Sequence, residues 1–245
     1  MLELNTFSIA ARCKRTGRLG VAVATAVPAV GALCPHVRAG VGAICTQSWT
    51  NPYLGIDGLG LLADGRSAAE ALEVVLAGDP GRASRQVGIV DHHGASAAWS
   101  GEECTPWFGH HSGTDFAVQG NMLMGEATLN AMTDTFACTE PLDLPERLLL
   151  VLEAAQAAGG DKRGHQSAAV KVVHQEEYPY LDLRVDEHHH PVAELRRVFE
   201  IARRQYLPFI VGMPTRSNPL GNLSDETRAM LLTPPPDRPG GGGSA

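Results

Sequence analysis

Near its amino end the sequence contains two short segments that are apolar at most positions, TFSIAAR (6–12) and LGVAVATAV (19–27), joined by a turn sequence that contains Gly17. Strands with one solvated face alternate apolar and polar residues, whereas strands covered on both faces are apolar nearly throughout. The second segment is made almost entirely of small apolar residues. The pair therefore predicts two strands of a sheet that is packed inside other layers.

The remaining sequence alternates groups of strands with groups of helices. Apolar runs bounded by turn residues predict strands over 40–49, 85–91, 95–101, 115–123, 165–173 and 180–186. Helical spacing predicts helices over 52–63, 67–78, 126–138, 143–159 and 191–206. We expect capping boxes at two of the helix starts, formed by Ser67 with Glu70 and by Asp143 with Glu146. The order favours an α+β fold of two mainly antiparallel sheets with helices outside them.

The carboxyl-terminal part of the sequence differs in composition from the rest. It is rich in Pro and Gly and ends in GGGGSA. Such a composition does not build a packed core. We therefore predict a single domain over 1–206 followed by a mobile tail over 207–245.

Charge and cysteine content exclude several classes of function. The chain has a net charge of −7, whereas nucleic acids and anionic membrane surfaces attract basic proteins, so we expect neither as a partner. The five cysteines lack metal-ligand spacing, and the start MLELN lacks the basic region of a signal peptide, so we expect reduced thiols and a cytoplasmic protein. Seven of the ten histidines are adjacent to one another, at 92–93, 110–111 and 188–190, as is usual for solvated turns, and we predict neither a metal nor another cofactor.

The stretch CTQSWTNPYLG (45–55) places polar side chains where a predicted strand enters a predicted helix. Amide side chains and backbone N–H groups at a helix start bind oxyanions and carboxylates, which makes Gln47, Asn51 and Tyr53 candidate site residues. Asn before Pro is equally the pattern of a helix cap. Asn121, in QGNML, is either a donor to a substrate carbonyl or a turn residue.

A second polar group lies in DKRGHQSAA (161–169) and LDLRVD (181–186). Asp182 and Arg184 have the same strand parity and point to one face. We expect a buried pair in which Arg184 clamps a substrate carboxylate with two hydrogen bonds, beside Gln166. A structural ion pair or an exposed strand edge is the alternative.

Long blocks of this sequence resemble a bacterial family of uncharacterised proteins grouped with the N-terminal-nucleophile (Ntn) hydrolases. The blocks include TFSIAAR, GRLGVAVATAVPAVGALCPHVRAGVGAICTQSWTNPYLG, AVQGNML, GDKRGHQSAAV and YLDLRVDEH, and the resemblance spans roughly 5–206. It implies a four-layer αββα sandwich. In Ntn hydrolases the first strand begins with a Thr, Ser or Cys that attacks an amide carbonyl, while its own α-amine, with a pKa near 8, is the base. The matching residue is Thr6.

The resemblance thus implies a hydrolase of a small-molecule, non-peptide amide bond, with a homo-oligomeric assembly expected as well. Thr6 would be the nucleophile and Gln47, Asn51 or Asn121 would stabilise the oxyanion. Substrate binding would fall to Tyr53, Gln166, Asp182 and Arg184.

The sequence departs from the Ntn pattern at one point, because the five residues MLELN precede Thr6. Two other functions therefore stay open. One is a non-catalytic protein that binds a small ligand on the same fold. The other is a hydrolase with an internal nucleophile, for which Ser48, Thr50 and Thr25 are the first candidates and the Cys45 thiol is a further one.

Overall fold

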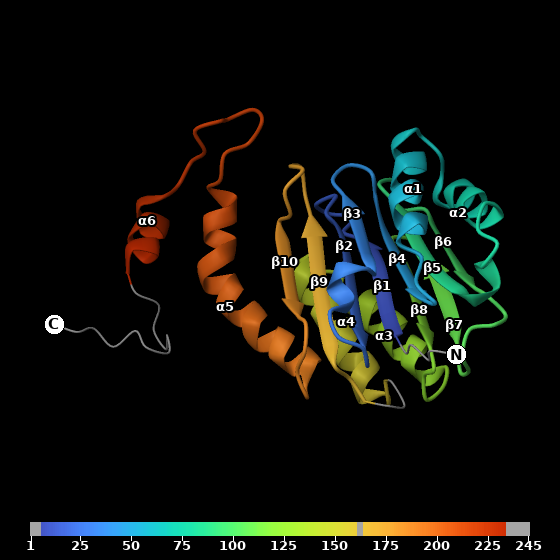
Figure 1. The fold of residues 1–245 in the computed structure, drawn as a ribbon. Helices are drawn as coiled ribbons and strands as arrows, with labels where there is room; N and C mark the ends of the chain where they lie inside the picture. Colours follow the sequence, from blue (N-terminus) through green and yellow to red (C-terminus); the bar gives the residue numbers. More distant parts are fainter. Residues whose placement is uncertain (1–5, 161–163, 234–245) are drawn as a thin grey trace. The chain divides into compact units, whose positions relative to one another are not determined.

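The computed structural model describes residues 6–160 and 164–233 (Figure 1). The chain forms two compact units, Met1–Arg196 and Arg197–Ala245. The strands are β1 (Thr6–Arg12), β2 (Leu19–Thr25), β3 (Pro35–Arg38), β4 (Gly42–Ser48), β5 (Arg85–Asp91), β6 (Ser96–Ser100), β7 (Gly109–Gly113), β8 (Phe116–Asn121), β9 (Ser167–Val173) and β10 (Leu181–Val185). The helices are α1 (Pro52–Ala63), α2 (Ala68–Ala77), α3 (Ala127–Cys138), α4 (Leu144–Ala157), α5 (Pro191–Val211) and α6 (Asp225–Leu232), with short 3₁₀ turns η1 (Val30–Ala32) and η2 (Arg82–Ser84).

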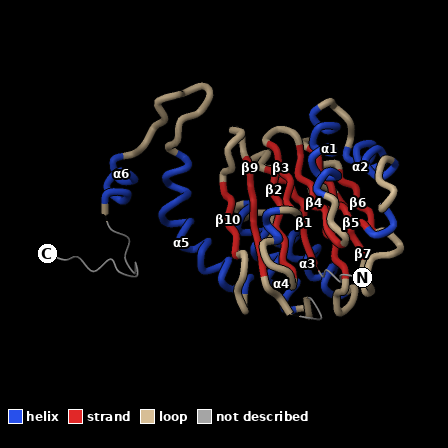
Figure 2. Tube along the Cα trace, in the orientation of Figure 1, coloured by secondary structure: helices blue, strands red, loops and turns tan. Residues whose placement is uncertain are grey.

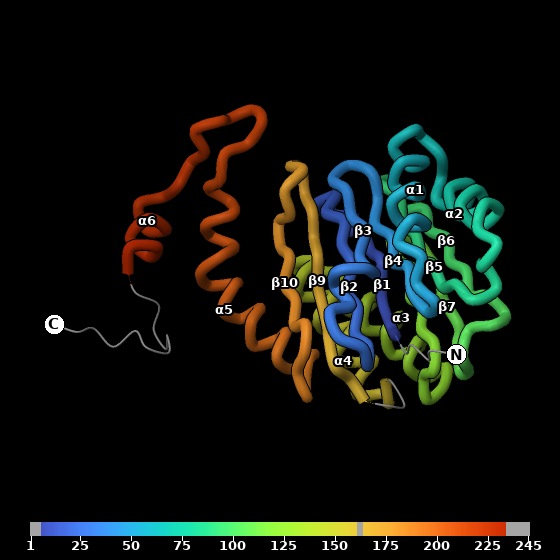
Figure 3. The backbone as a smooth tube through the Cα atoms, in the orientation of Figure 1, coloured from blue at the N-terminus to red at the C-terminus, as the bar shows by residue number. Residues whose placement is uncertain are grey.

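The strands of the first unit form two antiparallel sheets (Figure 2). One is six-stranded in the order β10-β9-β2-β1-β8-β7, and the other is four-stranded in the order β3-β4-β5-β6. β1 pairs with β2 along its whole length, from Thr6 opposite Thr25 to Arg12 opposite Leu19. β2 also lies beside β9, although the two are far apart in sequence (Figure 3). The prediction of two mainly antiparallel sheets is confirmed.

Helices pack on both sheets, and the two sheets also contact each other. α3 and α4 pack on the six-stranded sheet, and α1 and α2 pack on the four-stranded sheet. β1 contacts both β4 and β5, and β8 contacts β5, so the two sheets face each other. Val21, Val23, Cys45 and Val90 form part of one buried apolar cluster. These contacts explain why the central strands are apolar on both faces.

Two of the strands lie outside the predicted set. β3 is only PHVR, and β7 is GHHSG, which combines two glycines with two adjacent histidines. Neither segment has the apolar run that marks a strand in sequence. Both pair at the sheet edges, where β3 joins β4 and β7 joins β8. Pairing with a neighbour therefore sets their structure.

The carboxyl-terminal helices correct the prediction that helical structure ends at 206. α5 continues through Pro208 to Val211, with Phe199, Ala202 and Ile210 buried at helical spacing. α6 follows, and the hydroxyl of Ser224 caps its first turn. Apolar residues at helical spacing extend α5 beyond 206, and the Ser224 cap begins a further helix, α6. Residues 234–245 of the predicted tail lie outside the described residues.

The two predicted capping boxes have different outcomes. Ser67 accepts a hydrogen bond from the Glu70 backbone N–H, and the Glu70 carboxylate accepts one from the Ser67 backbone, as predicted. Asp143 makes no side-chain cap, and its carboxylate lies 3.2 Å from an Arg18 guanidinium nitrogen. A carboxylate can accept either bond, and here the Arg18 guanidinium lies within reach of it. The predicted cap at Asp143 is absent, and the carboxylate pairs instead with an arginine distant in sequence.

Five buried polar side chains connect the facing sheets, and we call them the inter-sheet amide network: Ser8 of β1, Gln47 of β4, Gln86 of β5, and Gln119 and Asn121 of β8. Ser8 Oγ donates to Gln47 Oε1 at 2.5 Å, and Gln119 Nε2 donates to Ser8 Oγ at 2.6 Å. Gln86 Oε1 accepts from Gln47 Nε2 at 2.8 Å and from Asn121 Nδ2 at 3.0 Å. Buried polar groups are costly unless paired, so this network fixes how the sheets align.

Gln86 is the member whose loss we expect to destabilise the fold most. Its Nε2 also donates to Ser100 Oγ and to the carbonyls of Gly109 and Gly120. Gln86→Leu would leave these acceptors and two amide donors buried without their partner. We predict a loss of about 2–4 kcal/mol in the free energy of unfolding, measured by urea denaturation.

The control is Gln175→Leu, because Gln175 is exposed in the turn before β10 and should change stability by less than about 0.5 kcal/mol. Equal stabilities of the two variants would contradict the role assigned to Gln86.

Candidate functional site

A cavity of about 210 Å³ adjoins Thr6 at the amino end of β1. Its other walls are the segment that contains η1 and the loop that follows β4. The polar side chains on its wall belong to Thr6, Gln47 and Thr50. Of the residues predicted to form a site, the structure therefore brings Thr6 and Gln47 to one cavity.

Thr6 is held on both sides by neighbouring strands. Its backbone pairs with Thr25 of β2 and with Asn121 of β8. Its hydroxyl lies 3.1 Å from the Thr25 hydroxyl, and its carbonyl accepts a hydrogen bond from Gln47 Nε2 at 3.3 Å. The residue is 4% exposed. A hydroxyl in this position has a fixed direction beside a small cavity.

The amide donors of Gln47 and Asn121 are already engaged within the inter-sheet network. Gln47 Nε2 donates to Gln86 Oε1 and to the Thr6 carbonyl, and Gln47 Oε1 accepts from Ser8. Asn121 Nδ2 donates to the same Gln86 oxygen. Asn121 Oδ1 is buried and has no hydrogen-bond partner among the described residues. The arrangement leaves Asn121 an acceptor for a donor group beside it.

Asn51 and Tyr53 lie away from this cavity. Asn51 Oδ1 accepts from the Tyr53 backbone N–H at 3.1 Å, which makes Asn51 the cap of α1. Both residues line a separate hollow of about 510 Å³ between α1 and α2, together with Asp57 and Asp64. The structure thus supports the capping interpretation of Asn51 and does not bring it to Thr6.

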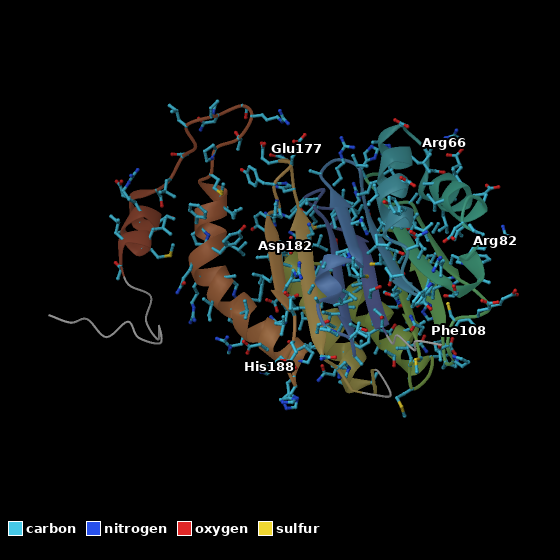
Figure 4. The ribbon with its side chains drawn as sticks, in the orientation of Figure 1. Arg66, Arg82, Phe108, Glu177, Asp182 and His188 are labelled. Carbon is cyan, nitrogen blue, oxygen red and sulfur yellow. The ribbon has the colours of Figure 1, made fainter. Side chains whose placement is uncertain are left out.

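The predicted buried pair of Asp182 and Arg184 does not form. β10 is an edge strand on which both residues are exposed, and Figure 4 labels Asp182 there. Asp182 pairs with Lys171 at 3.2 Å, and Arg184 pairs with Asp186 at 2.8 Å. The prediction that Asp182 and Arg184 point to the same face of the strand was correct. On β10, at the edge of the sheet, that face is exposed to solvent, while Leu181 and Val185 are buried.

Gln166 is connected to the site through its backbone, since its N–H donates to the Thr25 carbonyl at 2.7 Å. This bond supports the strand end that adjoins Thr6. Asp161 and Arg163, from the same predicted polar group, lie outside the described residues.

The other candidate nucleophiles have distinct environments. Ser48 ends β4 with a left-handed backbone (φ 66°), and the Thr50 hydroxyl donates to its carbonyl at 3.4 Å. Cys45 is fully buried in the apolar cluster between the sheets. Contact with Cys45, together with burial, raises the pKa of the Cys34 thiol well above its ordinary value. Cys34 is therefore a protonated, apolar part of the cavity wall.

Sequence reasoning missed a serine–histidine pair, in which Ser100 Oγ lies 2.9 Å from His110 Nδ1. Burial lowers the pKa of His110, which favours the neutral ring, and its tautomer decides which of the two atoms donates. The residues lie on β6 and β7, and β7 was not predicted, so no local pattern joined them. Neither lines the cavity beside Thr6.

Asp79 and Arg85 anchor the loop that forms one cavity wall. Arg85 Nε donates to Asp79 Oδ2 at 2.8 Å, and Arg85 Nη1 donates to the Trp49 carbonyl at 2.5 Å. Asn51 Nδ2 also donates to Asp79 Oδ2, at 3.3 Å. The hydrogen bond from Arg85 lowers the pKa of Asp79. The loop is thus tied to a charged pair that is mostly buried.

Two properties of the described residues concern metal binding and membrane spans. Within residues 6–160 and 164–233, no three side chains of His, Cys, Asp or Glu gather closely enough to hold a metal ion. Over the same residues, none of the helices combines the length and apolar character that crossing a membrane requires.

Residues 6–195 match the family model described as "Family of unknown function (DUF1028)". The chain belongs to this family. It is similar to the crystal structure of protein SPO2555 from Silicibacter pomeroyi, which is assigned to DUF1028, with 32% identity over 90% of this chain and 96% of that one and a TM-score of 0.83.

A more distant similarity is to Anbu (ancestral beta-subunit) from Yersinia bercovieri, with 12% identity over 82% of this chain and 96% of that one. Its TM-score of 0.38 is too low to support any inference. No curated protein matches the chain.

The lowered pKa of Asp79 predicts a pH dependence of stability. Its ionised form is favoured in the folded state, so its contribution is present above the unfolded pKa of about 3.9 and is lost as the pH falls through the lower folded pKa. Asp79→Asn should be less stable than wild type at pH 7, and the difference should shrink as the pH falls from about 5 towards 3. Urea midpoints at several pH values measure this.

Asp134→Asn is the control, because Asp134 is exposed on α3 and should leave the pH profile unchanged. A constant difference between Asp79→Asn and wild type at all pH values would refute the assigned role of Asp79.

Proposed function

We propose that the protein is an amidohydrolase of the Ntn type, with Thr6 as the nucleophile for a non-peptide C–N bond of a small molecule. The observation that carries the proposal is the place of Thr6, at the amino end of a central strand and on the wall of a cavity. The family match also begins at Thr6, so the five preceding residues lie outside it. The finer fold, a four-layer αββα sandwich, belongs to the same proposal and is supported by the helix pairs that pack on the two facing sheets.

The mechanism requires a free α-amine on Thr6. Hydrolysis of the peptide bond between Asn5 and Thr6 consumes one water, leaves a carboxyl group on Asn5 and releases this amine. With a pKa near 8, part of it is unprotonated at neutral pH and accepts the proton of the Thr6 hydroxyl.

The reaction then proceeds through an ester. Thr6 Oγ1 attacks the amide carbon, the amine passes the proton to the leaving nitrogen, and the C–N bond breaks to give an acyl ester on Thr6 and a free amine product. Water attacks the ester, its proton returns to Oγ1 by way of the α-amine, and the acid product leaves.

Neighbouring residues have supporting roles in this proposal. The Thr25 hydroxyl, 3.1 Å from that of Thr6, orients the nucleophile. Asn121 Oδ1 belongs to the residue paired with Thr6 across the strands, where side chains share one face, and it would accept a hydrogen bond from the α-amine. Gln47 holds the Thr6 carbonyl as a positioning residue. Thr50 would donate its hydroxyl to the oxyanion, because its present bond is long at 3.4 Å.

One observation favours a second function. The residues that precede Thr6 in the printed sequence leave its nitrogen in a peptide bond, which has no basic lone pair. Without cleavage, the same cavity would bind a small ligand and perform no chemistry.

Turnover of p-nitroanilides by variants of the full chain tests the hydrolase. Thr6→Ala should reduce kcat/KM by at least about 1,000-fold, since it removes the nucleophile. Thr6→Ser should retain measurable activity, because the hydroxyl and the amine are both kept. Thr16→Ala, in the turn at the opposite end of the β1–β2 hairpin, should behave as wild type.

Full activity of Thr6→Ala would reject Thr6 as the nucleophile and leave an internal nucleophile. Binding of small amides to wild type without any turnover would instead support the second function.

A further inference from the structure

The cavity beside Thr6 has almost no polar surface beyond its reacting end. Its wall includes the side chains of Val27, Pro28, Val30, Leu33 and Trp49. Among the described residues that line it, none is Asp, Glu, Lys, Arg or His. Transfer of an ionised carboxylate from water to such surroundings is strongly unfavourable. The apolar side chains of the cavity wall therefore favour binding of a neutral, apolar part of a ligand.

Two cations of the described residues that could have recognised an acid pair with carboxylates elsewhere. Arg184 pairs with Asp186, and Lys171 pairs with Asp182, all on or beside the edge strand β10. Neither cation lines the cavity. The chain is also acidic overall, with a net charge of −7, which disfavours the approach of anions.

The segment that forms the apolar wall is held in place by hydrogen bonds. Ser167 Oγ donates to the Val27 carbonyl at 2.6 Å and accepts from the Val30 N–H at 3.1 Å. Ala29 takes a left-handed backbone (φ 56°), and its N–H donates to the Asp186 carbonyl at 2.9 Å. A wall fixed at several points gives the cavity a definite shape before any ligand binds.

The volume limits what this shape can hold. An apolar cavity of about 150 Å³ accommodates a benzene molecule in a well-studied engineered protein. The present cavity, at about 210 Å³, has room for a ring of that size and a few further atoms. Leu33 and Trp49 are 53% and 52% exposed, so apolar surface continues from the cavity towards solvent.

We propose that this cavity is the acyl-binding site and that the substrates are amides of neutral, apolar acids about the size of an arylacetic acid. The proposal rests on the proposed function, since it places the scissile carbonyl at Thr6 and the acyl group against the wall formed by Val30, Leu33 and Trp49. Amides of dicarboxylic acids are poor substrates because their second carboxylate would have to enter an apolar site.

The test compares phenylacetyl-p-nitroanilide with glutaryl-p-nitroanilide, and binding of phenylacetamide with binding of glutaramate by ligand-observed NMR. Wild type should prefer the phenylacetyl compounds by at least tenfold in both measurements. Leu33→Lys places an ammonium group at the wall and should lower the phenylacetyl kcat/KM and raise the glutaryl value, each by about tenfold. Leu142→Lys introduces the same charge at an exposed leucine that does not line the cavity and should leave the preference unchanged.

The outcomes separate the two proposals. Selective binding of phenylacetamide that Leu33→Lys weakens, without turnover of either anilide, supports the apolar site and contradicts the hydrolase. Turnover that favours the glutaryl compound, or a preference that Leu33→Lys does not alter, overturns the apolar acyl site while the hydrolase stands. Because Leu33 is half-exposed, the lysine has a route to solvent, and thermal unfolding of the variant verifies that it folds.

Discussion

Ser8, Gln47, Gln86, Gln119 and Asn121 bring hydroxyl and amide groups between two sheets whose facing surfaces are otherwise largely apolar. Apolar contacts tolerate small slips between packed sheets, whereas hydrogen bonds between buried amides have fixed lengths and directions. Four strands, β1, β4, β5 and β8, contribute to this network. It therefore determines how the sheets align, and with them the position of Thr6 at the end of β1.

The same network separates structural from chemical roles in the site. Gln47 and Asn121 have the side chains expected of oxyanion donors, yet their N–H groups already hold Gln86. Among the described residues, the groups left near Thr6 are its own hydroxyl, the Asn121 Oδ1 atom, which has no hydrogen-bond partner there, and the apolar cavity. This combination suits a nucleophile that carries its own base, because no acidic or basic side chain among the described residues lines the cavity.

Local patterns predicted the parts of the fold that depend on local energetics. The apolar β1–β2 pair and the Ser67 cap are examples, since strand burial and capping are encoded within a few residues. Asp143 and Asp182 were assigned wrong partners, because Arg18 and Lys171 reach them from other elements. The resemblance indicated Thr6, and the polar stretch after β4 indicated Gln47, as candidate residues. The apolar wall was not predicted, because its residues converge only when the segment that contains η1 packs against β2 and β9.

The most direct test of the account is the identity of the amino-terminal residue in protein purified without a tag, by Edman sequencing and intact mass. The account predicts a chain that begins at Thr6, with the mass of the first five residues missing. A chain that retains MLELN in a preparation that hydrolyses amides would contradict the central claim, because Thr6 would then lack the amine that the mechanism requires.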